Sequence, residues 1–223
     1  MSPEPRSIPF WSPEEVERSL AATIEHLQSG LVLAYPTETV YGFGTNTDHA
    51  AVESLVALKK RPPAKPFLVL IAGSEMLERI GVTLTPAASR LAARHWPGPL
   101  TLVLPGGERR VAARLRGPEG GIAVRWTSHP NLQMLIRTYG DAITSTSANL
   151  PGLPAATAAA DIVRQWGGAI ARGALRVLDG GRLTVSPPST VVDCMGKRPR
   201  VIRPGAISAA VLRETVPELV GDA

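Results

Sequence analysis

Helix-forming and strand-forming patterns alternate along the chain, and this alternation restricts the fold to a narrow class. Ser12-Pro13-Glu14-Glu15 combines an N-cap serine, a proline at the first helical position and a glutamate that closes a capping box. Apolar residues then recur at helical spacing as far as Leu27, and Gly30 is suited to end the helix. The apolar run 31–35 follows, which predicts a buried strand.

The same two patterns repeat towards the C-terminus. Further helices are expected over residues 50–60, shortly after residue 74, and over residues 86–95, 128–139 and 158–166. Further strands are expected over residues 67–72, 100–104, 121–126, 141–144, 175–178, 190–194 and 200–202. Because the late strands follow one another without helices between them, part of the sheet should be antiparallel. The sequence predicts an α/β fold, a twisted mixed sheet with flanking helices, in one domain over residues 1–223 with its core at about 12–207.

Composition favours a globular protein in the cytoplasm. Hydrophobic residues make up 44% of the chain and charged residues 19%. No apolar run approaches the ~20 residues that span a bilayer, so no membrane partner is expected. Residues 1–11 lack the pattern of a signal peptide. Cys194 is the single cysteine and the four histidines are scattered, so no metal site built from protein side chains is predicted.

The net charge of +5 and the pI of about 9.9 favour anionic partners. Arginine outnumbers lysine 20 to 4, which a GC-rich genome would also produce. The lysines are more informative, because Lys59, Lys60 and Lys65 cluster with Arg61 in a proline-rich segment. Lysines in a last helical turn also complement the helix dipole, which accounts for Lys59 and Lys60 but not for Arg61 or Lys65. A stiff cationic cluster suits a polyphosphate, and the residues alone leave both interpretations open.

Polar residues gather at the ends of two expected strands. Residues 144–149 are mostly small and polar, and residues 35–42 carry two threonines and a glutamate. Ligands bind at the carboxyl ends of strands in open α/β sheets, although a solvated loop explains the same composition. Gly42-Phe43-Gly44 indicates a tight turn rather than a dinucleotide site. The long loop 179–188, rich in glycine and proline, is expected to form part of a lid.

Taken together, the segments resemble one known family, the YrdC/Sua5 threonylcarbamoyl-AMP synthases. The resemblance rests on YPTETVYGFG, KKRPPAKPF, HWPGPLTLVLP, STSANLPGLPAATA, LDGG, STVVD and VIRPGAI, in this order from about residue 31 to 207. It implies a sheet with a deep basic concave face. It also implies a nucleotidyltransferase that joins ATP, L-threonine and bicarbonate or CO2 into L-threonylcarbamoyl-AMP and pyrophosphate, the first step of t6A synthesis at tRNA position 37.

The resemblance also implies the site residues. Lys59 and Arg61 would be the catalytic cations, and L-threonine would be bound by Thr37, Arg125 and Ser189, with Thr39 left open as an alternative to Thr37. The ATP-binding set would be Lys59, Arg61, Lys65, Ser147, Asn149, Thr157 and Arg203. Mg²⁺ would accompany ATP, and tRNA and the t6A transferase complex are expected partners.

Three positions depart from the longer, Sua5-type members of the family. These members carry a histidine at the position of Leu70, a hydroxyl residue at Gly121 and an asparagine at Lys65. Their C-terminal domain has no counterpart here, so the short form is expected. Two alternative functions remain open: an RNA-binding module without catalysis, and a related carbamoyl-adenylate enzyme with another substrate. With only 4% aromatic residues, the chain offers little for stacking bases.

Overall fold

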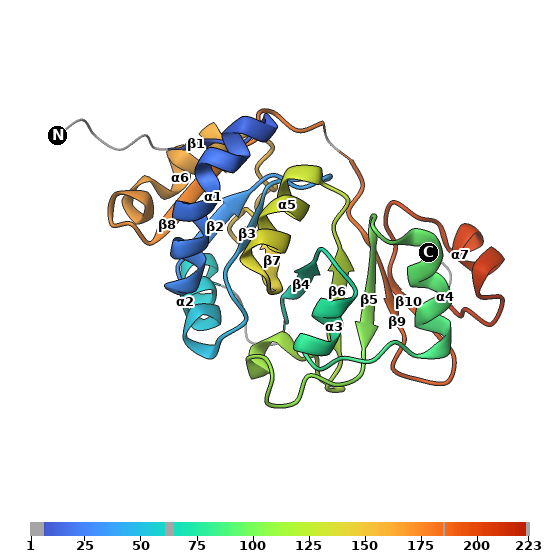
Figure 1. Ribbon diagram of the computed structural model, residues 1–223. Coiled ribbons are helices and arrows are strands. Elements are labelled where there is room, and N and C mark those ends of the chain that lie inside the picture. Colours follow the sequence, from blue (N-terminus) through green and yellow to red (C-terminus); the bar gives the residue numbers. More distant parts are fainter. Residues whose placement is uncertain (1–6, 61–64, 185, 222–223) are drawn as a thin grey trace.

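The computed structural model describes residues 7–60, 65–184 and 186–221. Its strands form one ten-stranded sheet in the order β1-β8-β2-β3-β7-β4-β6-β5-β9-β10 (Figure 1). The strands are β1 (Ile8–Pro9), β2 (Val32–Tyr35), β3 (Gly42–Gly44), β4 (Leu68–Ile71), β5 (Leu100–Leu104), β6 (Ile122–Trp126), β7 (Ile143–Ser147), β8 (Leu175–Asp179), β9 (Thr190–Asp193) and β10 (Arg200–Arg203). The helices are α1 (Pro13–Gln28), α2 (His49–Lys59), α3 (Glu75–Arg79), α4 (Pro86–His95), α5 (Pro130–Tyr139), α6 (Ala159–Ala171) and α7 (Ala209–Thr215), with a 3₁₀ turn at Ala113–Leu115.

The sheet mixes parallel and antiparallel pairs, as the sequence predicted. β8 is parallel to β1 and β2, β4 is parallel to β6, and β5 is parallel to β9. β3 pairs antiparallel with β2 and β7, and β7 pairs antiparallel with β4. The late hairpin β9–β10 is antiparallel. This arrangement confirms an α/β fold with a mixed sheet and flanking helices.

The first helix begins where its sequence predicts. Ser12 Oγ accepts a hydrogen bond from the Glu15 backbone N–H, and the Glu15 carboxylate accepts one from the Ser12 N–H at 3.0 Å. The two bonds satisfy backbone donors that the first helical turn leaves without partners. Past the other end, Gly30 adopts a left-handed φ of +72°, which glycine permits without steric cost.

Two expectations for the central strands are wrong. Gly42–Gly44 is strand β3 rather than a tight turn, and β7 continues through Ser147 instead of ending at Thr144. β3 lies between β2 and β7, and a Cβ on Gly44 would collide with the Thr144 carbonyl and the Tyr35 hydroxyl. The glycines therefore permit close packing between strands. The β1 strand, the 3₁₀ turn and α7 were not predicted.

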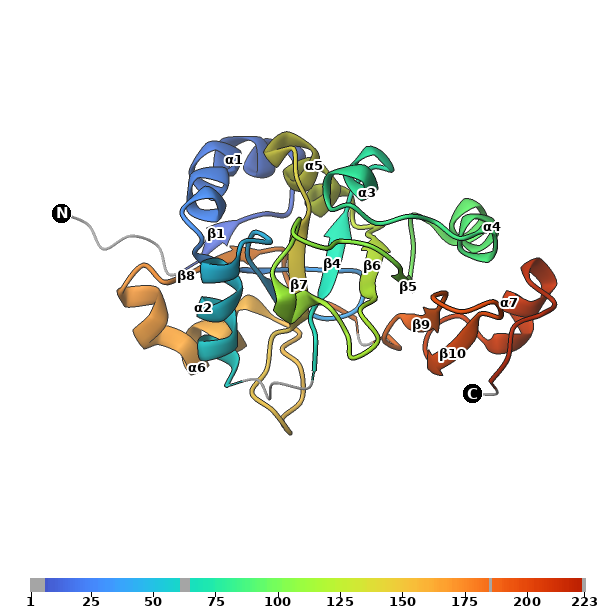
Figure 2. The ribbon, with the colours of Figure 1, turned by 90° about the horizontal axis from the view of Figure 1, so that it is seen from below.

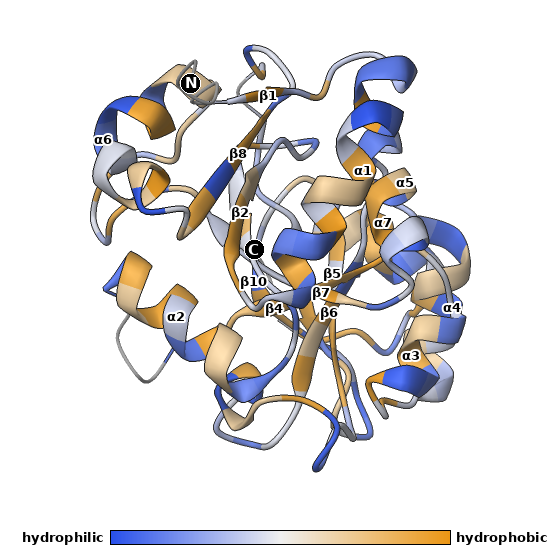
Figure 3. Cartoon of the chain, turned by 60° about the vertical axis from the view of Figure 1, so that its left-hand side comes forward, coloured by the Kyte–Doolittle hydropathy of each residue, from blue (hydrophilic) through white to orange (hydrophobic). Residues whose placement is uncertain are grey.

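The two faces of the sheet are covered differently. Figure 2 shows α1, α5, α3 and α4 along one side of the central strands, with the segment between β7 and α6 on the other side. In Figure 3, α1 and α4 each carry both hydrophilic and hydrophobic residues along their length. Alternate residues of the central strands, such as Val69, Leu102 and Val124, are fully buried. The intervening residues of the same strands point to the opposite face.

None of the helices in the described part of the chain is both long and apolar enough to cross a bilayer.

Candidate functional site

A cavity of about 490 Å³ is lined by residues of the central strands β4, β5, β6 and β7. Pairs of residues two apart on each strand line it: Leu68 and Leu70 of β4, Thr101 and Val103 of β5, Ala123 and Arg125 of β6, and Ser145 and Ser147 of β7. Successive side chains of a strand point to opposite faces, so this spacing places each pair on one face. The remaining lining residues come from the β2–β3 loop, from residues 186–191 and from β10, together with Gly42 of β3, Pro66, Thr146 of β7 and Ala155.

Five of the site residues expected from the sequence line this cavity. They are Thr37, Arg125, Ser147, Ser189 and Arg203. Thr39 lines it as well, so the cavity does not separate Thr39 from Thr37. The two threonines share a hydrogen bond of 3.1 Å between their hydroxyls, and Thr37 Oγ1 also donates to the Val40 carbonyl at 2.6 Å.

Lys59, the last residue of α2, is hydrogen-bonded to Ser147, which lines the cavity. Its side chain is almost wholly buried, with 3% of the residue exposed. Lys59 Nζ donates to the Ser147 carbonyl at 2.5 Å and to Asn149 Oδ1 at 2.9 Å. Asn149 Oδ1 also accepts from Ser147 Oγ at 2.6 Å, and its amide donates to the Leu153 carbonyl. The lysine, serine and asparagine expected to bind phosphate thus form one hydrogen-bonded group.

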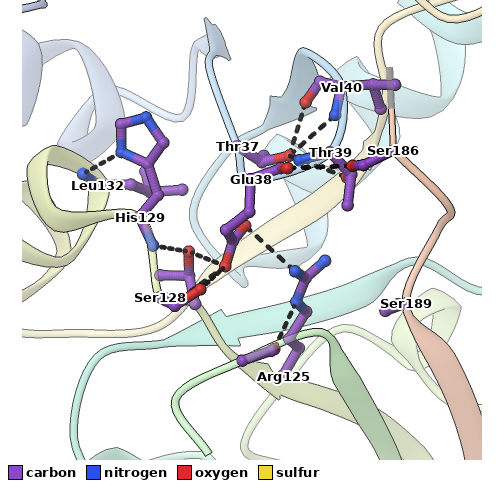
Figure 4. Close-up of polar contacts among 12 residues, drawn as sticks. Thr37, Glu38, Thr39, Val40, Arg125, Ser128, His129, Leu132, Ser186 and Ser189 are labelled. Atoms are coloured by element: carbon purple, nitrogen blue, oxygen red, sulfur yellow. Dashed lines mark hydrogen bonds and ion pairs between the residues drawn. The ribbon is translucent and has the colours of Figure 1, made fainter. Parts of the chain in front are cut away.

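Arg125 projects from β6 and meets Glu38 of the β2–β3 loop (Figure 4). Arg125 Nη2 lies 3.1 Å from Glu38 Oε2, and the two side chains are 6% and 19% exposed. Arg125 Nε donates to the Gly98 carbonyl at 3.0 Å. A guanidinium at the cavity wall is therefore held from two directions.

Glu38 is fixed on its other side by the segment that follows β6. Its Oε1 accepts hydrogen bonds from Thr127 Oγ1 at 3.0 Å and from the backbone N–H and hydroxyl of Ser128 (Figure 4). Burial opposes ionisation, but the Arg125 charge and the hydrogen bonds outweigh it and lower the pKa of Glu38. The carboxylate is therefore ionised at neutral pH.

Ser189 and Arg203 form a second polar group at the cavity wall. Arg203 Nη2 donates to the Ser189 carbonyl at 2.7 Å and to Ser189 Oγ at 2.9 Å. Ser189 Oγ also lies 2.9 Å from Thr101 Oγ1. Burial lowers the pKa of Arg203, and the nearby positive charge of Arg125 lowers it further. Two arginines close enough to repel each other make a site suited to an anion.

The other expected residues lie at or beyond the edge of the cavity. Lys65 is exposed and directly precedes Pro66, which lines the cavity. Thr157 does not line the cavity, and its carbonyl accepts from the Leu183 N–H at 2.8 Å. Arg61 lies outside the described residues.

The sequence analysis missed two contributors. Glu38 was noted as a polar residue but not assigned to the site, and Thr101 was treated only as part of a strand. Thr101 could have been found because it is the one polar residue in an otherwise apolar strand. It lies two residues before Val103, so both side chains are on the face of the strand that lines the cavity. The Glu38–Arg125 pair joins residues far apart in the chain, so no local pattern indicates it.

The loop after β8 lies against the same site. Tyr41 Oη donates to the Gly181 carbonyl at 2.7 Å and accepts from the Gly180 N–H at 3.0 Å. Ser186 Oγ donates to the Glu38 carbonyl at 3.2 Å, and both Ser186 and Pro188 line the cavity. Within the described part of the chain, no cluster of three His, Cys, Asp or Glu side chains could hold a metal ion.

Comparison with known families assigns the chain to one of them. A family model named for Sua5, YciO and YrdC, and described as "Telomere recombination", matches residues 25–205. The chain belongs to the Sua5/YciO/YrdC family. The family match covers every cavity-lining residue and confirms the resemblance seen in the sequence.

Members of this family similar to the chain share a name. A threonylcarbamoyl-AMP synthase of Pyrococcus abyssi is 35% identical over 194 residues, which is 86% of this chain and 56% of the relative. A threonylcarbamoyl-AMP synthase of Chromohalobacter salexigens is 35% identical over 81% of this chain and 95% of the relative. The chain therefore spans little more than half of the first relative and nearly all of the second.

A solved family structure has the same fold. The crystal structure of P. abyssi Sua5 complexed with L-threonine superimposes with a TM-score of 0.84 at 30% identity. The match covers 96% of this chain and 62% of the Sua5 chain.

Proposed function

We propose that the protein is an L-threonylcarbamoyl-AMP synthase, which converts ATP, L-threonine and bicarbonate or CO2 into L-threonylcarbamoyl-AMP and pyrophosphate. One observation carries the proposal: buried Arg125 lies in the wall of a cavity also lined by Ser147, and Ser147 is hydrogen-bonded to Lys59. The proposal assigns Arg125 to the carboxylate of threonine and Lys59 to the polyphosphate of ATP. The names of the relatives and the threonine complex of P. abyssi Sua5 support the same assignment.

The chemistry requires charge neutralisation more than a reactive side chain. The ammonium group of bound threonine first loses a proton to solvent. The neutral amine then attacks CO2, with release of a second proton, or attacks bicarbonate, with loss of water, and either route forms a carbamate. A carbamate oxygen then attacks the α-phosphorus of ATP, and the bond to the pyrophosphate leaving group breaks. Both steps bring anions together, so fixed cations and hydrogen-bond donors lower the barrier.

The residues divide into two groups in this proposal. Arg125 would bind the threonine carboxylate, with the hydroxyls of Thr37 or Thr39 and Ser189 around the amino acid. The ATP phosphates would be bound by Lys59, Arg61, Lys65, Ser147 and Asn149, and the rest of the nucleotide by Thr157 and Arg203. Mg²⁺ would enter as part of the ATP substrate. The product would be consumed by the t6A transferase complex acting on tRNA in the cytoplasm.

Pyrophosphate release tests the proposal directly. The assay combines the protein with ATP, L-threonine, bicarbonate and Mg²⁺, and then omits each substrate in turn, without tRNA. Release should require both threonine and bicarbonate. Three results would favour a related carbamoyl-adenylate enzyme: release without threonine, a preference for serine over threonine, or a preference for carbamoyl phosphate over bicarbonate. Binding of tRNA with no turnover would favour an RNA-binding module.

A further inference from the structure

Positive charges outnumber negative charges among the side chains that line the cavity. Among its described lining residues, two arginines, Arg125 and Arg203, face a single carboxylate, Glu38. The other polar lining side chains are hydroxyls of serine, threonine and tyrosine. A positively charged ligand group in this cavity therefore has one anionic partner available, and that partner lies 3.1 Å from an arginine nitrogen.

The contacts of Glu38 hold its carboxylate in the ionised form and in one position. Its Oε1 accepts three hydrogen bonds from Thr127 and Ser128, while Oε2 faces Arg125. A carboxylate with this many donors is poorly suited to take a proton, but it holds its negative charge in place. Thr127 and Ser128, which follow β6, hold the carboxylate in position, and β6 itself carries Arg125.

Arg125 lines the cavity although it is ion-paired. Its side chain is more than nine-tenths buried, and Nη2 is shielded from solvent and forms no hydrogen bond of good geometry among the described residues. Because Nε is occupied by the Gly98 carbonyl, the guanidinium cannot rotate away from the cavity without losing that bond. Arg125 and Glu38 line the same cavity, so a ligand carboxylate paired with the Arg125 guanidinium from the cavity would come to lie close to Glu38.

We propose that Glu38 and Arg125 together recognise the zwitterionic head group of an α-amino acid, with Glu38 acting as a specificity residue that favours the amine and disfavours a simple carboxylate. The inference rests on the proposed function and specifies how that site selects its amino-acid substrate. A lone carboxylate on Arg125 would leave two like charges facing each other in a buried site, which is unfavourable. An α-ammonium group beside Glu38 removes this repulsion and gains a charge-assisted hydrogen bond.

Calorimetric binding of two ligands to the wild-type protein tests the inference. The ligands are L-threonine and 2,3-dihydroxybutanoate, which carries a hydroxyl in place of the amine. We expect threonine to bind at least ~10-fold more tightly, the ratio that one charge-assisted hydrogen bond supplies. Equal affinities would overturn the inference. This comparison needs no variant, so it holds even if a substituted protein fails to fold.

The Glu38→Gln variant then shows whether Glu38 causes the preference for threonine over dihydroxybutanoate. We expect it to weaken threonine binding and to leave dihydroxybutanoate binding unchanged or tighter, so that the ratio of affinities falls by ~10-fold. Glu53→Gln is the matched control, because Glu53 Oε1 lies 3.1 Å from Arg114 Nε and neither residue lines the cavity. It should keep the wild-type ratio.

The remaining outcomes contradict the inference in distinct ways. Equal weakening of both ligands in Glu38→Gln would show a purely structural role, and no change would show no role. In either case threonine-dependent pyrophosphate release by the wild type would leave the proposed function intact. A wild type that binds no threonine would contradict the inference and the proposed function together.

Discussion

Lys59 shows how much one residue contributes to this site. A buried ammonium group is costly unless it is hydrogen-bonded, and Lys59 is satisfied by Ser147 and Asn149. Lys59→Met keeps the apolar stem and removes the charge. We expect turnover to fall by ~30- to 1,000-fold, or ~2–4 kcal/mol of transition-state stabilisation. The measurement is threonine-dependent pyrophosphate release, and the exposed Lys197→Met serves as the control. Wild-type turnover in Lys59→Met would contradict the role.

Glu38 predicts a pH dependence of stability. Its pKa is lowered in the folded protein, so its contribution to stability is present above the ordinary glutamate pKa of about 4.3 and is lost as the pH falls through the lower folded value. The free energy of unfolding of the wild type should therefore exceed that of Glu38→Gln at pH 6, and the difference should shrink as the pH falls below ~4.

Denaturant unfolding of both proteins between pH 6 and pH 3 measures this difference. Arg125 stays charged throughout this range. Burial lowers the pKa of His129 and the Glu38 charge opposes that shift, so the two proteins are compared at pH values below the titration of His129. A difference that grew on acidification would contradict the assignment of Glu38 as an ionised partner of Arg125.

Two polar segments of the site were predictable because they follow expected strands: Thr37 lies two residues after β2, and Ser147 ends β7. Arg125 was assigned only through the family resemblance. The contacts between them were not predictable, because Glu38 and Arg125 meet only once the β2–β3 loop is placed beside the end of β6. Such a contact depends on strand order, which local patterns do not contain.

At the scale of elements, the N-terminus of α1 gives a test of local stability. Ser12→Ala removes the hydroxyl that accepts from the Glu15 N–H. We expect a loss of about 1 kcal/mol in the free energy of unfolding, with turnover unchanged because α1 does not line the cavity. Chemical denaturation measures the loss, and Ser54→Ala, which removes an exposed hydroxyl within α2, is the control. An equally stable Ser12→Ala variant would contradict the capping role.

The loop after β8 gives a second test at this scale. Ser186 and Pro188 line the cavity, and the same loop carries Arg182, a site for trypsin. If the loop closes over bound substrates, ATP and L-threonine together should slow tryptic cleavage after Arg182 by ~10-fold, because cleavage requires local opening. Mass spectrometry of the fragments measures the rate, with cleavage after Arg18 as the internal reference. Equal rates with and without ligands would contradict a lid.

Elements with strong local signals were predicted and weaker ones were missed. The capping box of α1 and the apolar runs of β4 and β5 each carry their own signal. β3 was missed because glycine is a poor strand former, and its conformation is set by β2 and β7 on either side. β1 has two residues and exists through its pairing with β8.

At the scale of the whole molecule, strand order assembles the site. The alternation of helices and strands predicted a mixed α/β sheet, but it did not give the order in which β7, β4, β6 and β5 lie side by side. That order places alternate residues of all four strands on one face, beneath one cavity. The continuity of the sheet supports our proposal that the core at about residues 12–207 forms a single domain.

The most direct test of the account is mass spectrometry of the products formed from ATP, L-threonine, bicarbonate and Mg²⁺. The account predicts L-threonylcarbamoyl-AMP together with pyrophosphate, with the label from ¹³C-bicarbonate in the carbamoyl group. A wild-type reaction without L-threonylcarbamoyl-AMP, or one that forms a carbamoyl-adenylate without threonine, would contradict the account.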